Sequence, residues 1–120
     1  MSRPSLSMRF AAPLVAALVL AACGQPVPPE KAAYIGIWRS APQPDRSMEL
    51  VIDADGRVRY KRFEGRSSTA VDGPIKGFDG DHFDVGIGPI STRFIVSRPP
   101  QQQHGDDWKM TVDGVELIRR

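Results

Sequence analysis

The stretch that decides the fold runs from Met48 to Phe63 and reads MELVIDADGRVRYKRF. Apolar and polar residues alternate on either side of an Ala-Asp-Gly loop, which is typical of a half-buried β-hairpin. A three-residue loop at 54–56 places Gly56 where the hairpin bulge needs a positive φ. This register pairs Ile52 with Val58 and Leu50 with Tyr60 on one face, and Asp53 with Arg57, Val51 with Arg59 and Glu49 with Lys61 on the other. Loops of two or four residues place apolar residues opposite charges, so matching faces favour the three-residue loop.

A second hairpin is predicted over Trp108–Arg120, WKMTVDGVELIRR. Its Asp113-Gly114 dipeptide is a strong signal for a two-residue turn of type I′. The pairs that follow are Val112 with Val115, Thr111 with Glu116, Met110 with Leu117 and Trp108 with Arg119. One face of this hairpin is therefore apolar, as the core of a small β-domain requires.

The rest of the chain indicates more short strands and lacks the spacing of an amphipathic helix. Strands are expected at Tyr34–Ser40, Ser67–Ile75, His82–Ile87 and Ile90–Ser97, with a tight Gly88-Pro89 turn and a polar surface loop at Pro99–Asp107. The fold class is thus all-β, a small antiparallel barrel or a two-sheet sandwich of seven to eight strands. It occupies residues 34–120 as a single domain.

The N-terminal segment is typical of a secretory signal. Arg3 and Arg9 precede an eleven-residue apolar run, Phe10–Leu20, and small residues follow it. This run is shorter than the roughly 20 residues that a membrane span needs. A start at Met8 also gives a complete signal, so the sequence leaves the start at Met1 or Met8 open.

The end of this signal, Leu20-Ala21-Ala22-Cys23, resembles the lipobox of bacterial lipoprotein precursors, and Cys23 is the one cysteine of the chain. The resemblance implies a diacylglyceryl group on the Cys23 sulfur and cleavage by signal peptidase II between Ala22 and Cys23. It also implies acylation of the new amino terminus. Thiolate nucleophilicity suits Cys23 to lipid attachment, and more than one acyl chain gives stable anchoring.

The resemblance divides the chain into a signal peptide at 1–22, a lipidated cysteine with a tether at 23–33, and the β-domain. Gly24 stands where lipoproteins kept in the inner membrane carry Asp, so the expected location is the periplasmic face of the outer membrane. The prolines of Gly24–Lys31, GQPVPPEK, predict a semi-rigid, extended tether. Besides this membrane, a protein partner in the cell envelope is expected.

The charge of the mature chain argues against a nucleic-acid partner. The whole sequence carries 16 basic and 14 acidic side chains, but Arg3 and Arg9 leave with the signal. The 14 basic side chains that remain equal the acidic ones in number. A basic patch for phosphate binding is therefore not indicated.

The first expected strand carries a candidate binding motif, Gly36-Ile37-Trp38-Arg39. It resembles the first-strand signature of lipocalins, in which the Trp closes the barrel floor and an Arg covers it. This resemblance implies binding roles for Trp38 and Arg39. The alternative is that Trp38 is an ordinary core residue, because large aromatic side chains dominate small cores.

Arg62 is the third candidate binding residue. Alternation places Arg57, Arg59 and Lys61 on the outer face of the hairpin, where acidic residues lie opposite. Arg62 falls on the inward side, opposite Met48. A charge there needs a rim position, a bulge or a partner.

Catalytic and metal chemistry are not indicated. The segment Asp79–Asp84, DGDHFD, lacks the spacing of a calcium loop, and a zinc site has no further ligand but His104 to draw on. It is expected to be a turn that leads into a strand. No Gly-x-Ser-x-Gly or Ser-x-x-Lys motif is present, and Cys23 is assigned to lipid. No cofactor or metal is therefore expected.

These patterns predict a non-enzymatic outer-membrane lipoprotein whose periplasmic β-domain binds a partner. Two alternatives stay open. One is an inhibitor of a cell-wall lytic enzyme or protease that acts through the loop Pro99–Asp107. The other is a lipocalin-like carrier of a small apolar ligand.

Overall fold

A computed structural model describes residues 25–102, 105 and 107–119. The predicted signal peptide, Ala22 and the lipobox Cys23 lie outside the described residues. The described chain folds as one 3₁₀ helix followed by nine strands: η2 (Pro29–Tyr34), β1 (Gly36–Ser40), β2 (Arg46–Ile52), β3 (Arg57–Glu64), β4 (Ser67–Asp79), β5 (His82–Ile87), β6 (Ile90–Phe94), β7 (Val96–Gln102), β8 (Trp108–Val112) and β9 (Val115–Arg119).

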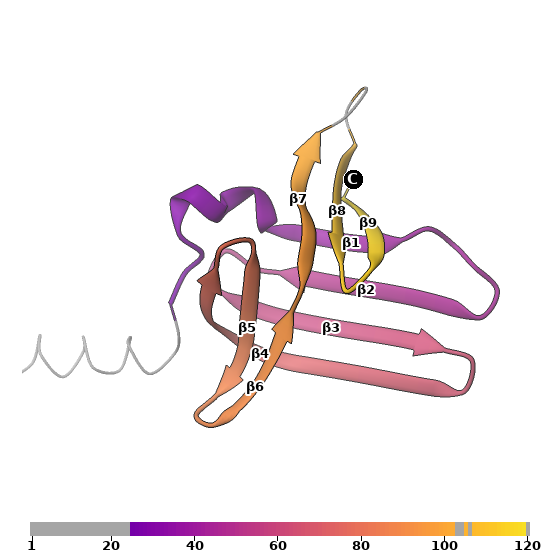
Figure 1. The fold of residues 1–120 in the computed structure, drawn as a ribbon, viewed down its shortest axis with the longest axis horizontal. Helices are drawn as coiled ribbons and strands as arrows, with labels where there is room; N and C mark the ends of the chain where they lie inside the picture. Colours follow the sequence, from indigo (N-terminus) through magenta and orange to yellow (C-terminus); the bar gives the residue numbers. More distant parts are fainter. Residues whose placement is uncertain (1–24, 103–104, 106, 120) are drawn as a thin grey trace, which may run out of the picture.

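The strands form a single antiparallel sheet in the order β6-β5-β4-β3-β2-β1-β9-β8-β7. The sheet is curled into a half-barrel, so that β5–β9 cross in front of β1–β4 (Figure 1). The two edge strands, β6 and β7, are consecutive in the chain and are joined through Ile95. The all-β, antiparallel prediction is confirmed, and the architecture is one curled sheet.

Both predicted hairpins have the predicted registers. Between β2 and β3, Ile52 pairs with Val58 and Leu50 with Tyr60. Gly56 has a φ of 92°, as the bulge requires. The second hairpin is confirmed in the same way, since all four predicted β8–β9 pairs occur and the turn residues Asp113 and Gly114 have positive φ values of 48° and 78°.

The strand count and one loop were predicted wrongly. The segment Ile90–Ser97 is split at Ile95, where the chain leaves β5 and joins β8. The Ile95 N–H donates to Asp113 Oδ1 (2.9 Å) and its carbonyl accepts the Asp113 N–H (2.8 Å). β7 then extends into the predicted loop as far as Gln102. Its prolines, Pro99 and Pro100, are tolerated because an edge strand does not need every N–H for pairing.

The proline-rich segment before the domain is folded rather than extended over part of its length. Pro29–Tyr34 is a 3₁₀ helix with proline at its start, where the missing N–H costs nothing. Tyr34, predicted to begin a strand, ends this helix and is buried in the core. Val27 N–H also donates to the carbonyl of Ala54 (3.1 Å). The prediction of an extended tether over Gly24–Lys31 is therefore wrong from Pro29 onward, whereas Pro28 is extended.

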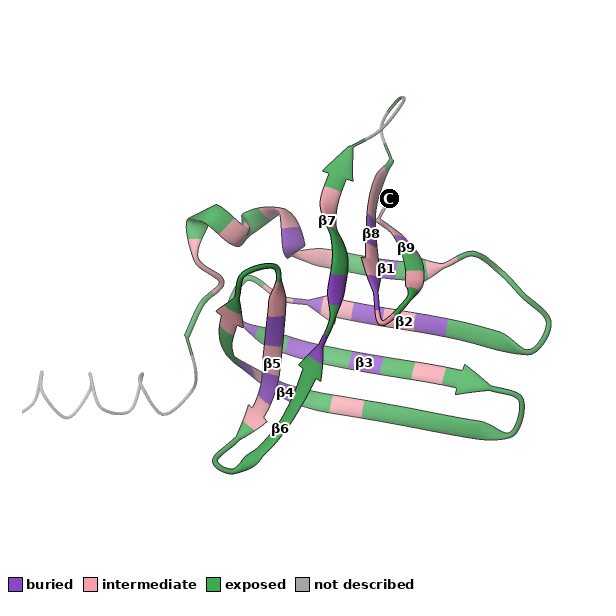
Figure 2. Cartoon of the chain, in the orientation of Figure 1, coloured by how far each residue is buried: buried purple, intermediate pink, exposed green. Residues whose placement is uncertain are grey.

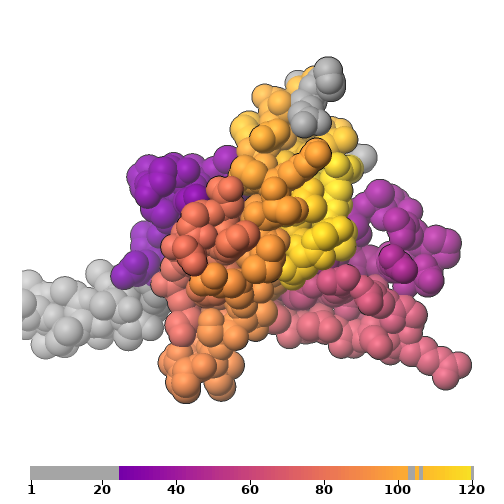
Figure 3. All heavy atoms as spheres, viewed as in Figure 1, coloured from indigo at the N-terminus to yellow at the C-terminus, as the bar shows by residue number. Residues whose placement is uncertain are grey.

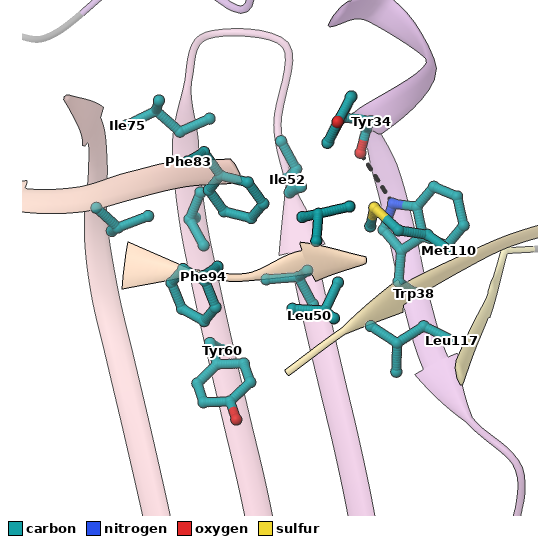
Figure 4. Packing of buried hydrophobic residues seen from close by; sticks show 14 of the residues in the cluster. Tyr34, Trp38, Leu50, Ile52, Tyr60, Ile75, Phe83, Phe94, Met110 and Leu117 are labelled. Carbon is teal, nitrogen blue, oxygen red and sulfur yellow. Dashed lines mark hydrogen bonds between the residues drawn. The ribbon is translucent and has the colours of Figure 1, made fainter. Parts of the chain in front are cut away.

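The core lies between the two layers of the curled sheet (Figure 2). Each of the nine strands contributes inward-facing side chains to it, and η2 contributes Tyr34. The members are Tyr34, Trp38, Met48, Leu50, Ile52, Val58, Tyr60, Ile75, Phe83, Val85, Phe94, Val96, Met110, Val112 and Leu117. Phe94 stacks on Phe83 at 5.1 Å and meets the edge of Tyr60 at 5.0 Å (Figure 4). Such aromatic pairs add to the stabilisation that apolar burial provides.

Candidate binding groove

The ends of β2, β3 and β4 project beyond the layer that covers their other halves (Figures 1 and 3). The change is visible in the sequence of β3. Val58 and Tyr60 are buried on its inner face, but the next inward residue, Arg62, is half-buried and Glu64 is exposed. The inner face therefore changes from apolar to polar, and from buried to exposed, where the cover ends (Figure 2 shows the change in burial).

A groove of about 350 Å³ lies at this projecting end. One wall is the β8–β9 turn, and the other is formed by the loop after β1, the start of β2 and the end of β3. The lining residues are Ser40, Ala41, Gln43, Arg46, Ser47, Met48, Arg62, Phe63, Glu64, Gly114, Val115 and Glu116. We call this feature the Arg62 groove. Its volume lies within the range of small binding pockets.

Arg62 is held in place by its own strand. It forms an ion pair with Glu64, in which Nε donates to Oε1 at 2.7 Å. The Tyr60 hydroxyl, and to a smaller extent Glu64, raise the pKa of Arg62 above its ordinary value. The guanidinium therefore stays charged. Burial raises the pKa of Tyr60, whose hydroxyl points away from the core cluster (Figure 4). Arg62 thus lies at the rim of the covered region and has Glu64 as an ion-pair partner, two of the conditions under which its charge could be accommodated there.

The structure does not bring the other two candidate residues to this groove. Trp38 is fully buried and its Nε1–H donates to the Tyr34 carbonyl at 2.8 Å. Arg39 points to the opposite face of β1 and pairs with Glu49 (2.8 Å). The sequence pattern had placed Lys61 opposite Glu49, and it does lie there in the ladder, but Arg39 takes the ion pair.

An arginine does cover Trp38, and it comes from the last strand. The Arg119 guanidinium lies 5.1 Å from the Trp38 ring and 4.9 Å from the Trp108 ring. Its Nη1 donates to the carbonyls of Ala33 and Ile35, both at 2.7 Å. Burial lowers the pKa of Arg119. The predicted pairing of Trp108 with Arg119 was the available signal for this contact, but it did not reveal Trp38 on the other side.

The acidic segment Asp79–Asp84 forms a turn and a strand start, as predicted. Gly80 has a φ of 61° and sits in the turn between β4 and β5. Arg93 bridges two of the acids, with its Nε 2.9 Å from Asp84 Oδ1 and its Nη1 3.1 Å from Asp79 Oδ2. This contact lowers the pKa of Asp84. His82 is occupied as well, since its Nδ1 accepts the Val96 N–H at 2.9 Å.

Within the described part of the chain, no group of three or more His, Cys, Asp or Glu side chains is arranged to hold a metal ion. The basic stretch of β3 is in ion pairs, with Arg57 2.8 Å from Asp72 and Arg59 3.6 Å from Asp53. Arg57 lies opposite Asp53 as predicted, since the Asp53 N–H donates to the Arg57 carbonyl (2.9 Å), but its guanidinium pairs with Asp72 of β4. The arrangement leaves these charges on a solvated outer face.

Comparisons with known proteins give no relative for this chain. No family model matches it, and neither a curated protein nor a solved structure is similar enough to count as a match. Among the residues that the structure describes, no helix has the length and apolar character for crossing a bilayer.

Proposed function

We propose that the protein is a non-enzymatic lipoprotein of the bacterial outer membrane whose β-domain binds a protein partner of the cell envelope through the Arg62 groove. The lipobox Leu20–Cys23 supports the anchor, and Gly24 supports the outer membrane over the inner one. Cys23 would carry the lipid, and the β-domain would face the periplasm.

The observation that carries the binding role is the projecting end of β2–β4. Strand ends that leave the core gain little from apolar burial, so their length needs another explanation. Their groove combines Arg62 with Met48 and Phe63, and Arg, Met and aromatic residues are enriched in protein interfaces. Phe63 follows Arg62 on β3 and so belongs to the other face of the strand, where it is 49% exposed, so apolar surface is open to a partner at the edge of the groove.

The geometry favours a protein partner over the two alternatives. The space inside the half-barrel is filled by the core cluster, with Trp38 among its fully buried members, so an apolar ligand would have to displace core side chains. The inhibitor hypothesis relied on a long loop at Pro99–Asp107, and residues 99–102 of that loop belong to β7. We therefore place the contact surface in the Arg62 groove.

Photo-crosslinking in intact cells tests this proposal. A photoreactive amino acid at Gln43, in the loop that lines the groove, is expected to give a discrete protein adduct. Arg62→Glu in the same protein should abolish that adduct, because it reverses the charge of a side chain that lines the groove. The matched control places the probe at Ile37, which is 47% exposed on the outer face of β1. An equal adduct from Ile37, or one that survives Arg62→Glu, would contradict the proposal.

The anchor is tested separately with Cys23→Ala. This variant should lack the acyl mass on its N-terminal peptide and should keep its signal segment, since signal peptidase II acts before a lipidated cysteine. A variant that is processed and membrane-bound like the wild type would rule out the anchor at Cys23.

A further inference from the structure

The tip of the β5–β6 hairpin exposes two large apolar side chains. Ile87 and Ile90 are 73% and 77% exposed, the highest values among the exposed large hydrophobic residues in the described chain. They are paired across the Gly88-Pro89 turn. Their side chains cover no part of the core, so the tip presents an apolar surface that requires an explanation.

The tip is held in a defined shape. Gly86 lets the strands approach closely, because a Cβ at this position would lie 2.0 Å from the Ile90 carbonyl oxygen. Lys76 of β4 donates from Nζ to the Gly88 carbonyl at 2.5 Å. A cationic side chain is therefore fixed beside the apolar pair.

The described chain enters the domain at this same end of the molecule. A Cβ built on Gly56 would lie only 2.1 Å from the Gln25 carbonyl oxygen. The chain at Gln25 is therefore already in contact with the β2–β3 loop. Residues 25–28 and β4 residues 75–78, Lys76 included, line a common space. The entry point lies at the left of Figure 1 and the hairpin tip at the lower left, whereas the β3–β4 turn lies at the far right.

We propose that the hairpin tip contacts the lipid surface, with Ile87 and Ile90 inserted at the boundary between headgroups and acyl chains. This inference relies on the proposed lipid anchor at Cys23. Only Gly24 stands between Cys23 and Gln25, so the two residues are at most about 7 Å apart along the chain. An anchor that close to a docked residue holds this end of the domain on the bilayer, and interfacial apolar side chains enter it to a depth of about 5–10 Å.

Two further features fit this orientation. Lys76 would meet lipid phosphates, as basic side chains do beside inserted apolar groups. The Arg62 groove, at the projecting ends of β2 and β3, would face away from the membrane and be open to a partner. The tip and the groove thus have separate tasks at opposite ends of the domain.

Quenching by lipids with brominated acyl chains tests the inference. The lipidated protein is placed in phosphatidylethanolamine–phosphatidylglycerol vesicles as two matched variants, Ile90→Trp at the tip and Phe63→Trp at the far end. Both retain the native Trp38 and Trp108, so the difference between them reports the added tryptophan. The tip variant is expected to be quenched about threefold more strongly, because bromine quenches at short range and the tip lies within the interface.

Ile87→Trp provides a second tip position, and near-ultraviolet circular dichroism verifies that each variant is folded. Equal quenching of folded tip and Phe63→Trp variants overturns the inference while leaving the anchor intact. Mass analysis of the N-terminal peptide from the same sample identifies the other failure. A protein without lipid on Cys23 overturns both the proposed anchor and the contact that relies on it.

Discussion

The two halves of the β2–β3 hairpin differ in what lies over them. At the loop end, Ile52 and Val58 face each other beneath the crossing strands and are almost fully buried. At the other end, Met48 faces Arg62 and Arg46 faces Glu64, so the inner face is mostly polar. The same ladder runs through both halves. We therefore expect the stability of the domain to depend mainly on the covered half, because beyond Met48 the projecting half presents mostly polar side chains.

The largest expected effect comes from Trp38→Ala in the covered region. This change removes a fully buried indole, its hydrogen bond to the Tyr34 carbonyl and its contact with Arg119. A loss of about 3–5 kcal/mol in the free energy of unfolding is expected, which is a large part of the stability of a small domain. Urea unfolding monitored by circular dichroism measures it.

Trp108→Ala is the matched control, because Trp108 contacts the other side of Arg119 but is only partly buried. Its effect should be clearly smaller. If the two variants lose equal amounts of the free energy of unfolding, the deeper burial of Trp38 does not increase its contribution to stability.

Gly86→Ala is expected to have the next largest effect. The added methyl group meets the Ile90 carbonyl, and φ at Gly86 is 155°. A loss of about 1–3 kcal/mol is expected from this overpacking. Gly77→Ala is the control, since nothing lies within 4 Å of its Cβ position. Comparison of the two urea midpoints measures the effect, and a Gly77 variant that is as unstable as the Gly86 variant would contradict it.

Tyr34→Phe should change the pH dependence of stability. Burial, and then Asp81, raise the pKa of Tyr34 from 10.0 to about 12 in the folded protein. The unfolded chain therefore ionises first, and stability is lost as the pH rises from 10 towards 12. The variant should lose about 1 kcal/mol at neutral pH with the hydrogen bond to the Asp81 carbonyl.

The measurement for Tyr34→Phe is the urea midpoint between pH 9 and 12, read against the pKa values of 10.0 and about 12. The variant should lose less stability over this range than the wild type. The residual slope belongs in part to Tyr60, whose pKa is also raised by burial. Parallel curves for wild type and variant would show that Tyr34 ionises alike in both states.

The hairpins could be predicted because their information is local. The glycine turns and the alternation on either side set both registers, and a slip of one residue would reverse every face. The split at Ile95 could not be predicted in this way, because it depends on Asp113, which is 18 positions further along the chain. The same limit applies to η2, whose position depends on burial of Tyr34 among Phe78 and Phe83.

The sequence predicted one residue of the candidate site, Arg62, but it did not predict the groove around that residue. Arg62 could be identified because the alternation of side chains along the strand places its charge on the apolar face. That alternation is a local signal. The groove around it also needs the β8–β9 turn, and no local pattern shows that this turn lies near the start of β2. The structure supplies the contact, and with it the reason why Arg62 is at a rim.

The smallest effect on stability is expected from Arg62→Ala in the projecting half. The side chains of Arg62 and Glu64 are 31% and 49% exposed, so their ion pair is screened by solvent. Its loss should change the free energy of unfolding by less than about 1 kcal/mol. Crosslinking from Gln43 should nevertheless fall strongly, because the groove loses the charge of a side chain that lines it.

Arg39→Ala is the control for that variant, since Arg39 also has an ion pair, at 2.8 Å to Glu49, but on the outer face of β1. It should change stability as little as Arg62→Ala and leave crosslinking unaltered. A large loss of stability in Arg62→Ala would mean that the projecting half belongs to the folding core after all. A small loss in the free energy of unfolding, together with lost crosslinking, would show that Arg62 acts in binding and contributes little to folding. The projecting half would then serve binding and the covered half stability.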